Sequence, residues 1–119
     1  MEQENQTNKL VFESRFFPEG VEVRLLLNNY VDNNNLYIGL LSPSEDNPGE
    51  WDHFTDITIN IETLPPFHGY IDTRDSNEGV DLFLMLNGIA RPACKHLNGF
   101  GLYKFNEQKL KELVPEFFL

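Results

Sequence analysis

Cysteine, basic residues and long apolar runs are all scarce in this chain of 119 residues. Its one cysteine, Cys94, excludes a disulfide framework and a cysteine-rich zinc module. Lysine and arginine number 9 against 19 aspartates and glutamates, which gives a formal net charge of −10. Binding to a phosphate backbone over the whole surface would need a net positive face. Direct nucleic-acid binding is therefore not expected.

No apolar run approaches the roughly 20 residues of a membrane-spanning helix. Residues 1–6 also lack the basic and apolar regions of a signal peptide. We therefore expect a soluble, cytoplasmic protein that does not contact a membrane. The chain has no Gly-Lys-Ser/Thr phosphate loop, no Gly-x-Ser-x-Gly elbow and no Rossmann fingerprint, so no cofactor is expected.

Hydrophobic residues make up 40% of the chain, with 10 phenylalanines, which is enough for one folded domain. In the first half, apolar residues alternate with other residues at the period of a half-buried β-strand. The alternation predicts four strands, which cover residues 10–17, 21–27, 36–41 and 54–61. The first two would form a hairpin around the turn 18–20. Two prolines, a glycine and three acids predict a loop over 42–50.

The second half mixes helix and strand patterns. Asp75 stands three residues before Glu78, as in a capping box, and Gly88 suits a left-handed helix stop. We therefore expect a helix over about 75–87, and its wide apolar surface predicts that a sheet or a partner covers it. Four further elements are expected: an edge strand over 67–71, a strand over 100–105, a helix over 107–114 capped by Asn106, and a docked apolar tail over 117–119.

Together these elements predict an α+β fold. It consists of an antiparallel meander of four to six strands, with the 75–87 helix packed on the sheet and the 107–114 helix beside it. Residues 1–8 are polar and are expected to form a flexible tail, which leaves one domain over 9–119. Residues 1–66 hold twelve acids and three bases, so the meander is predicted to carry most of the negative charge.

Three segments resemble a known family: Tyr70-Ile71-Asp72-Thr73, Leu86-Asn87-Gly88-Ile89-Ala90-Arg91-Pro92, and Asn98-Gly99-Phe100-Gly101-Leu102-Tyr103-Lys104-Phe105. A similar order occurs in a small family of uncharacterised bacterial proteins, a domain of unknown function associated with plasmids, phages and conjugative elements. The resemblance covers roughly residues 54–110. It departs at Ala93-Cys94, where the family has Thr-Gly. It supports the fold and implies no activity, substrate or cofactor.

Cys94 and His96 are the only cysteine and histidine close together in the sequence. Nearby Arg91, Lys95 and His96 would favour the thiolate of Cys94 and could make it a catalytic nucleophile. The alternative is a structural or incidental cysteine, because a free cysteine usually behaves as a small buried hydrophobe. The stretch after Pro92 is predicted to be a loop, which does not fix the two side chains on one side.

Two groups of residues could form an interaction surface. Trp51 follows the acidic loop and could be a binding anchor, or it could open the next strand. The basic stretch of Arg91, Lys95 and Lys104, together with Tyr103, could contact a nucleic-acid strand, or it could belong to a solvated loop. The candidate residues are Glu45, Asp46, Glu50, Trp51, Asp52, Asp56, Arg91, Lys95 and Tyr103.

No metal site is expected. The three histidines, His53, His68 and His96, are 15 and 28 residues apart. Metal motifs use short spacings such as His-x-x-x-His or Cys-x-x-Cys. The acids around Asp46 lack the alternation of a calcium loop, and Pro48 interrupts them.

Hypotheses from different classes remain open. The preferred one is a non-enzymatic accessory protein of a mobile genetic element that acts through contacts with an unknown protein partner. In a sharper version, the carboxylates of residues 1–66 imitate nucleic-acid phosphates and occupy the basic groove of a partner. The alternatives are a small enzyme that uses the Cys94/His96 pair, and a homodimer that associates through the 117–119 tail.

Overall fold

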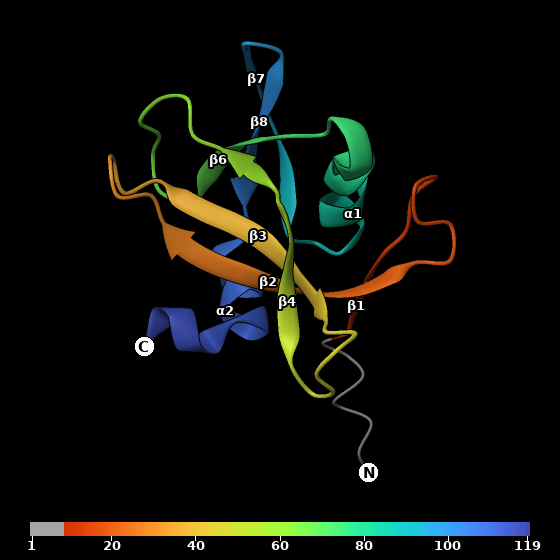
Figure 1. The fold of residues 1–119 in the computed structure, drawn as a ribbon. Coiled ribbons are helices and arrows are strands. Elements are labelled where there is room, and N and C mark those ends of the chain that lie inside the picture. Colours follow the sequence, from red (N-terminus) through yellow and green to blue (C-terminus); the bar gives the residue numbers. More distant parts are fainter. Residues whose placement is uncertain (1–8) are drawn as a thin grey trace.

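The computed structural model describes residues 9–119, and the predicted tail over 1–8 lies outside the described residues. Within the described part, eight strands form two antiparallel four-stranded sheets (Figure 1). The first sheet has the order β1-β2-β3-β4: β1 Leu10–Phe12, β2 Val21–Asn29, β3 Leu36–Pro43 and β4 Trp51–Asp56. The second has the order β5-β6-β8-β7: β5 Thr58–Ile59, β6 His68–Ile71, β7 Ala90–Leu97 and β8 Phe100–Phe105.

Two short α-helices accompany the sheets. Helix α1 (Val80–Leu86) precedes β7, and helix α2 (Glu107–Leu113) follows β8. Figure 1 shows α1 beside the second sheet, whereas α2 and the C-terminus lie near β2. Antiparallel strands with separate helices make an α+β fold, as the sequence predicted. In residues 9–119 no helix has the length and apolar content to cross a membrane.

The core is built from the alternating residues of β2 and β3, which the sequence predicted to share one face. They are Val23, Leu25, Leu27, Leu36, Ile38 and Leu40, and all are buried. Helix α1 adds Val80, Phe83 and Leu84 on its buried side, and α2 adds Leu110. Each such side chain contributes about 1.5–3 kcal/mol when it is fully removed from water, so the apolar alternation drives the packing of helices on sheets.

The strand predicted over 54–61 is in fact two strands that belong to different sheets. Strand β4 ends at Asp56, and β5 begins at Thr58. The fully buried Ile57 stands between them: its N–H donates to the Ile38 carbonyl at 2.8 Å, and its carbonyl accepts from the Asp72 N–H at 2.9 Å. The period of two continues through this bend, so the alternation alone did not separate the two sheets.

Three other strand predictions need correction. The first strand ends at Phe12 rather than at residue 17, and residues 13–20 connect it to β2. Strand β6 lies inside its sheet between β5 and β8, so it is not an edge strand. The stretch after Pro92 is not a loop but most of β7, with an irregular register against β8 between Pro92 and His96. Hydrogen bonding to β8 stabilises the extended conformation of β7, which the local sequence does not indicate.

The helix predicted over 75–87 begins as a 3₁₀ turn over Asp75–Asn77, and the α-helical part starts at Val80. The predicted capping box is wrong, because no side chain caps this segment and Gly79 is the residue before the α-helix. The predicted stop is confirmed: Gly88 has φ 70°, and the next N–H donates to the Leu84 carbonyl at 2.9 Å.

The C-terminal predictions are largely confirmed. Asn106 caps α2, since its side chain accepts a hydrogen bond from the Lys109 N–H at 3.1 Å. In the tail, Phe117 and Phe118 pack against the core, whereas Leu119 is fully exposed. The tail therefore docks through its two aromatic residues only.

Candidate functional site

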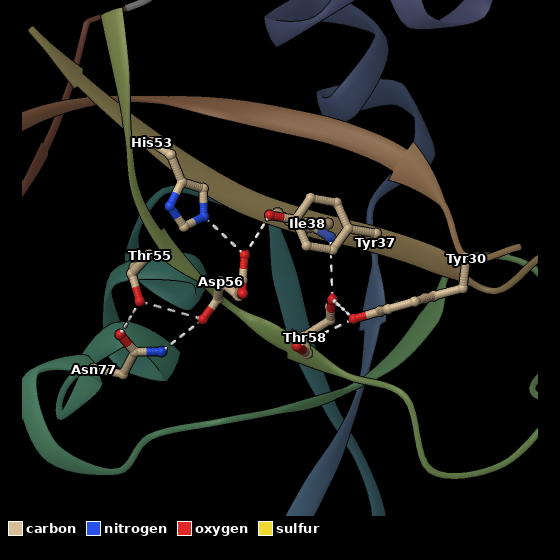
Figure 2. A network of polar contacts seen from close by, with 8 residues as sticks. All are labelled: Tyr30, Tyr37, Ile38, His53, Thr55, Asp56, Thr58 and Asn77. Atoms are coloured by element: carbon tan, nitrogen blue, oxygen red, sulfur yellow. Dashed lines mark hydrogen bonds and ion pairs between the residues drawn. The ribbon is translucent and has the colours of Figure 1, made fainter.

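A connected set of polar side chains lies where β3, β4 and β5 meet (Figure 2). On the solvent side, the Tyr37 hydroxyl donates to Asp56 Oδ1 at 2.5 Å, and His53 Nε2 lies 2.9 Å from the same oxygen. The His53 and Asp56 side chains are both more than half exposed. We refer to Tyr37, His53 and Asp56 as the Asp56 cluster.

The contacts of the Asp56 cluster change the acidity of its members. The hydrogen bond from Tyr37, and after it the one to His53, lowers the pKa of Asp56 below its ordinary value. Burial, followed by the bond to Asp56, raises the pKa of Tyr37. At neutral pH the carboxylate is therefore ionised and the phenol protonated, and the cluster presents a fixed negative group to solvent.

A β-bulge brings His53 and Asp56 to the same face. In the pairing of β3 with β4, Leu40 is opposite Thr55 and Leu41 is opposite His53, so Phe54 is an extra residue. In a regular strand, residues three apart point to opposite faces. The extra residue brings His53 and Asp56 to the same face. The sequence pattern does not indicate this bulge.

Gly39 makes room for the tyrosine. Gly39 is directly opposite Asp56 in the sheet, and the Tyr37 side chain crosses it to reach the carboxylate. A Cβ atom at residue 39 would collide with the Tyr37 hydroxyl and would stand 3.1 Å from the Thr55 carbonyl oxygen. The absence of a side chain at this position is therefore part of the cluster's geometry.

The inner half of the network joins the two sheets and is structural. Buried Thr58 accepts a hydrogen bond from the Ile38 N–H at 3.1 Å and shares another with the Tyr30 hydroxyl at 3.0 Å (Figure 2). Buried Asn77 donates to the Asp56 carbonyl at 2.8 Å and accepts from the Thr55 hydroxyl at 2.7 Å. These bonds hold the end of β4 and the start of β5.

The acidic candidates from the sequence lie on the β3–β4 hairpin. Trp51 opens β4, as one interpretation of the sequence had it, and the Arg24 guanidinium lies 4.0 Å from the centroid of its ring. This cation–π contact covers one face of the indole, so Trp51 is not a bare anchor. Four exposed carboxylates lie in or next to the β3–β4 connection: Glu45, Asp46, Glu50 and Asp52.

The basic candidates lie on the β7–β8 hairpin, which projects from the body of the molecule (Figure 1). Lys95 donates to Glu62 at 3.0 Å, and the Tyr103 hydroxyl donates to Asp81 of α1 at 3.4 Å. Both residues are therefore engaged within the molecule. Arg91 is exposed and has no ion pair with a carboxylate in residues 9–119.

Cys94 and His96 lie in the irregular part of β7, where the register against β8 shifts. Both are exposed, and the Cys94 backbone is left-handed with φ 58°. In the described part of the chain, no hydrogen bond links the two side chains. A nucleophile pair at this position stays a prediction, without geometric support.

The histidines lie on three different strands: His53 on β4, His68 on β6 and His96 on β7. Across residues 9–119, no group of three or more histidine, cysteine, aspartate or glutamate side chains is placed to hold a metal ion. His53 contacts Asp56, and His68 Nδ1 lies 2.9 Å from the Pro66 carbonyl oxygen. A carbonyl only accepts, so Nδ1 of His68 carries the proton.

An exposed apolar group lies at the junction of α1 and β1, where the sequence indicated no site. Leu82 and Leu86 are one turn apart on α1 and are 54% and 77% exposed. With Val11 of β1, which is 47% exposed, they line an open hollow of about 320 Å³. We refer to Val11, Leu82 and Leu86 as the α1 patch. The wide apolar surface predicted for the helix was the signal that could have located it.

Comparison with protein families gives a match over most of the chain. The model of the family described as "Domain of unknown function (DUF4313)" matches residues 24–118, from β2 to the C-terminal tail. No curated protein and no solved structure matches the chain. The matched residues include β3, β4 and most of β2 of the first sheet, whereas β1 lies outside them. Since it spans most of the sequence, the chain belongs to the DUF4313 family of domains of unknown function.

Proposed function

We propose that this protein is a binding domain that acts in the cytoplasm through protein–protein contacts, as an accessory protein of a mobile genetic element. The observation that carries the binding role is the α1 patch. The mobile-element setting rests on the resemblance of the second half to a family associated with such elements.

The α1 patch has the composition of a small interface. Its centre is apolar, with Leu82 and Leu86 from α1 and Val11 from β1. At its rim, Arg15 donates to Glu78 at 3.0 Å in an exposed ion pair. An apolar centre with a charged rim is the usual arrangement of a protein interface, and exposed apolar groups that cluster mark contact sites more often than scattered ones do.

The opposite side of α1 is buried in the core. Val80, Phe83 and Leu84 pack into the core, so they already satisfy the need of α1 for a covered face. Leu82 and Leu86 add exposed apolar area that the fold itself does not require. A partner that covers them would remove this area from water at about 25 cal/mol per Å².

A second candidate is the nucleic-acid mimic, favoured by the carboxylates of the β3–β4 hairpin. Among residues 9–119, no basic nitrogen lies within 4.0 Å of a carboxylate oxygen of these four residues, Glu45, Asp46, Glu50 and Asp52. The Asp56 cluster adds a further ionised carboxylate on β4. Exposed carboxylates of this kind could replace phosphates in a basic groove, and such binding would weaken steeply with salt.

Affinity capture of the tagged full chain in its native host tests both candidates. The variant Leu82→Gln/Leu86→Gln removes the apolar centre without changing the net charge. We expect it to reduce the captured partner, measured by quantitative mass spectrometry, by at least about tenfold, since centrally placed apolar contacts carry most interface energy. The control Val31→Gln changes an isolated residue that is 99% exposed and should leave capture unchanged.

The mimic makes the opposite prediction. If the carboxylates carry the binding, Glu45→Gln/Asp46→Asn/Glu50→Gln/Asp52→Asn loses the partner and the α1 variant retains it. Binding of the wild-type chain would then also fall steeply between low and physiological salt. A partner that is retained equally by both variants and by the control would contradict both candidates.

A further inference from the structure

A row of three basic side chains crosses the second sheet. In the ladder of β7 and β8, Arg91 is directly opposite Lys104, and in the ladder of β6 and β8, Lys104 is directly opposite His68. Directly opposed residues in an antiparallel pair point to the same face with their Cβ atoms about 5 Å apart. We refer to Arg91, Lys104 and His68 as the basic row.

The basic row is electrostatically unfavourable as it stands. Like charges directly opposite each other destabilise a strand pair. Among residues 9–119, no carboxylate oxygen lies within 4.0 Å of a side-chain nitrogen of Arg91 or Lys104. Glu107, which lines the same cleft as Arg91 and Lys104, is already paired with Lys111 at 3.1 Å. Two positive charges are therefore uncompensated on a molecule with a net charge of −10.

The two uncompensated cations border a cleft. Arg91 and Lys104 line an open cleft of about 950 Å³ where the ends of β7 and β8 meet the start of α2. Gln108, the helix-capping Asn106 and the ion-paired Glu107 and Lys111 also line it, and Phe67 gives it an aromatic wall. The cleft thus combines cationic, amide and aromatic groups in a space large enough for a small organic ligand.

The aromatic wall is held under strain. Phe67 has φ 62°, a left-handed conformation that is an outlier for a bulky residue. The fold maintains it from two sides: the Phe67 carbonyl accepts from the Phe105 N–H at 2.7 Å, and its ring stacks on Phe118 with centroids 6.3 Å apart. Such a conformation costs free energy, and these two contacts offset the cost.

We propose that the cleft binds a phosphorylated small molecule. Arg91 and Lys104 bind the phosphate group, and the organic part of the ligand packs on Phe67. A phosphate monoester carries about −1.5 to −2 charges at neutral pH, which matches the two uncompensated cations better than a single carboxylate does. The Arg91 guanidinium can bind two phosphate oxygens at once.

Titration calorimetry on the full chain tests the proposal with two probes, inorganic phosphate and adenosine 5′-monophosphate. We expect both to bind, the nucleotide more tightly because only it can use the Phe67 wall. The variant Arg91→Gln/Lys104→Gln should weaken binding of both by at least about tenfold, since it removes two charge-assisted sets of hydrogen bonds. Amide chemical shifts of residues 67, 91, 104 and 106 should change on titration with the wild-type chain.

The control Lys9→Gln/Arg24→Gln removes the same charge at two residues that do not line the cleft, and it should change affinity by less than about twofold. Equal losses in the two double variants would overturn the site in favour of a bulk charge effect. Equal affinity for the two probes would overturn the role of Phe67. No binding of either probe, or much tighter binding of a single-stranded oligonucleotide, would overturn the small-molecule proposal. Unfolding curves verify that both variants fold.

Discussion

The acidity and contacts of individual side chains in this protein depend on neighbours that are distant in the sequence. Asp56 is an exposed carboxylate, yet its pKa is lowered because Tyr37 and His53 both bond to one of its oxygens. The tyrosine reaches it only because residue 39 is a glycine. The acidity of one side chain therefore depends on a missing side chain on the adjacent strand.

The first prediction concerns the pH dependence of this contact. Tyr37→Phe removes the hydroxyl, so the pKa of Asp56 should rise toward its ordinary value in an NMR titration of the side-chain carboxyl. Because the folded state lowers this pKa, the contact stabilises the protein above about pH 4 and is lost as the pH falls through the lowered pKa. The stability difference, below about 1 kcal/mol for so exposed a group, should vanish in acid.

Tyr30→Phe is the matched control, since the Tyr30 hydroxyl bonds to Thr58 and not to Asp56. It should leave the pKa of Asp56 where it is in the wild-type chain. An Asp56 titration that does not change in Tyr37→Phe would show that the phenol is not what lowers the pKa.

At the scale of elements, the decisive feature is the passage from β4 to β5. The chain leaves the first sheet at Asp56 and enters the second at Thr58, with Ile57 bonded to both sides. The pairing of β3 with β4 ends at this point. The Thr58 side chain then supplies an acceptor for the buried Ile38 N–H. A side chain thus replaces a missing ladder bond, which keeps a buried donor satisfied.

We therefore expect Thr58→Val to be more harmful than its similar volume suggests. It leaves the Ile38 N–H without its acceptor, and an unsatisfied buried donor costs about 1–3 kcal/mol in the free energy of unfolding. Urea unfolding followed by circular dichroism measures this change. Thr58→Ser, which keeps the hydroxyl and removes only a methyl group, should lose clearly less. Equal losses in the two variants would show that packing and not the hydrogen bond matters here.

At the scale of the whole molecule, both sheets and both helices contribute to a shared core. The C-terminal tail closes it, since Phe118 stacks on Phe67 of the segment before β6 and contacts Phe117 at right angles. This packing uses the aromatic residues that the homodimer hypothesis would assign to a partner. The tail is thus already engaged within one chain.

We predict that Phe118→Ala lowers the free energy of unfolding by about 1–2 kcal/mol, because it removes a partly buried ring from its aromatic contacts. Leu119→Ala, at the fully exposed end, should change it by less than about 0.5 kcal/mol. Light scattering across a range of concentrations should give the same mass for both variants and the wild-type chain. A mass that falls in Phe118→Ala would favour the homodimer through the tail.

Much of the fold was available from local patterns. The alternation from Val21 to Leu27 identified a core-facing strand, Gly88 marked the helix stop, and Asn106 marked the start of α2. Candidate residues were only partly found: Asp56, Arg91 and Lys104 were named from the sequence, whereas Tyr37 entered no predicted site and the direct pairing of Arg91 with Lys104 was not predicted. These partners share no periodicity or motif with the residues that they face.

The sequence by itself determined the fold class, the buried face of β2 and β3, the stop of α1 and the start of α2, because these depend on residues within a few positions of one another. Only the tertiary structure decided that one predicted strand divides between two sheets, that a bulge turns His53 toward Asp56, and that Arg91 faces Lys104. Those features depend on register between distant segments, and register is decided by the packing of the whole core rather than by any local pattern.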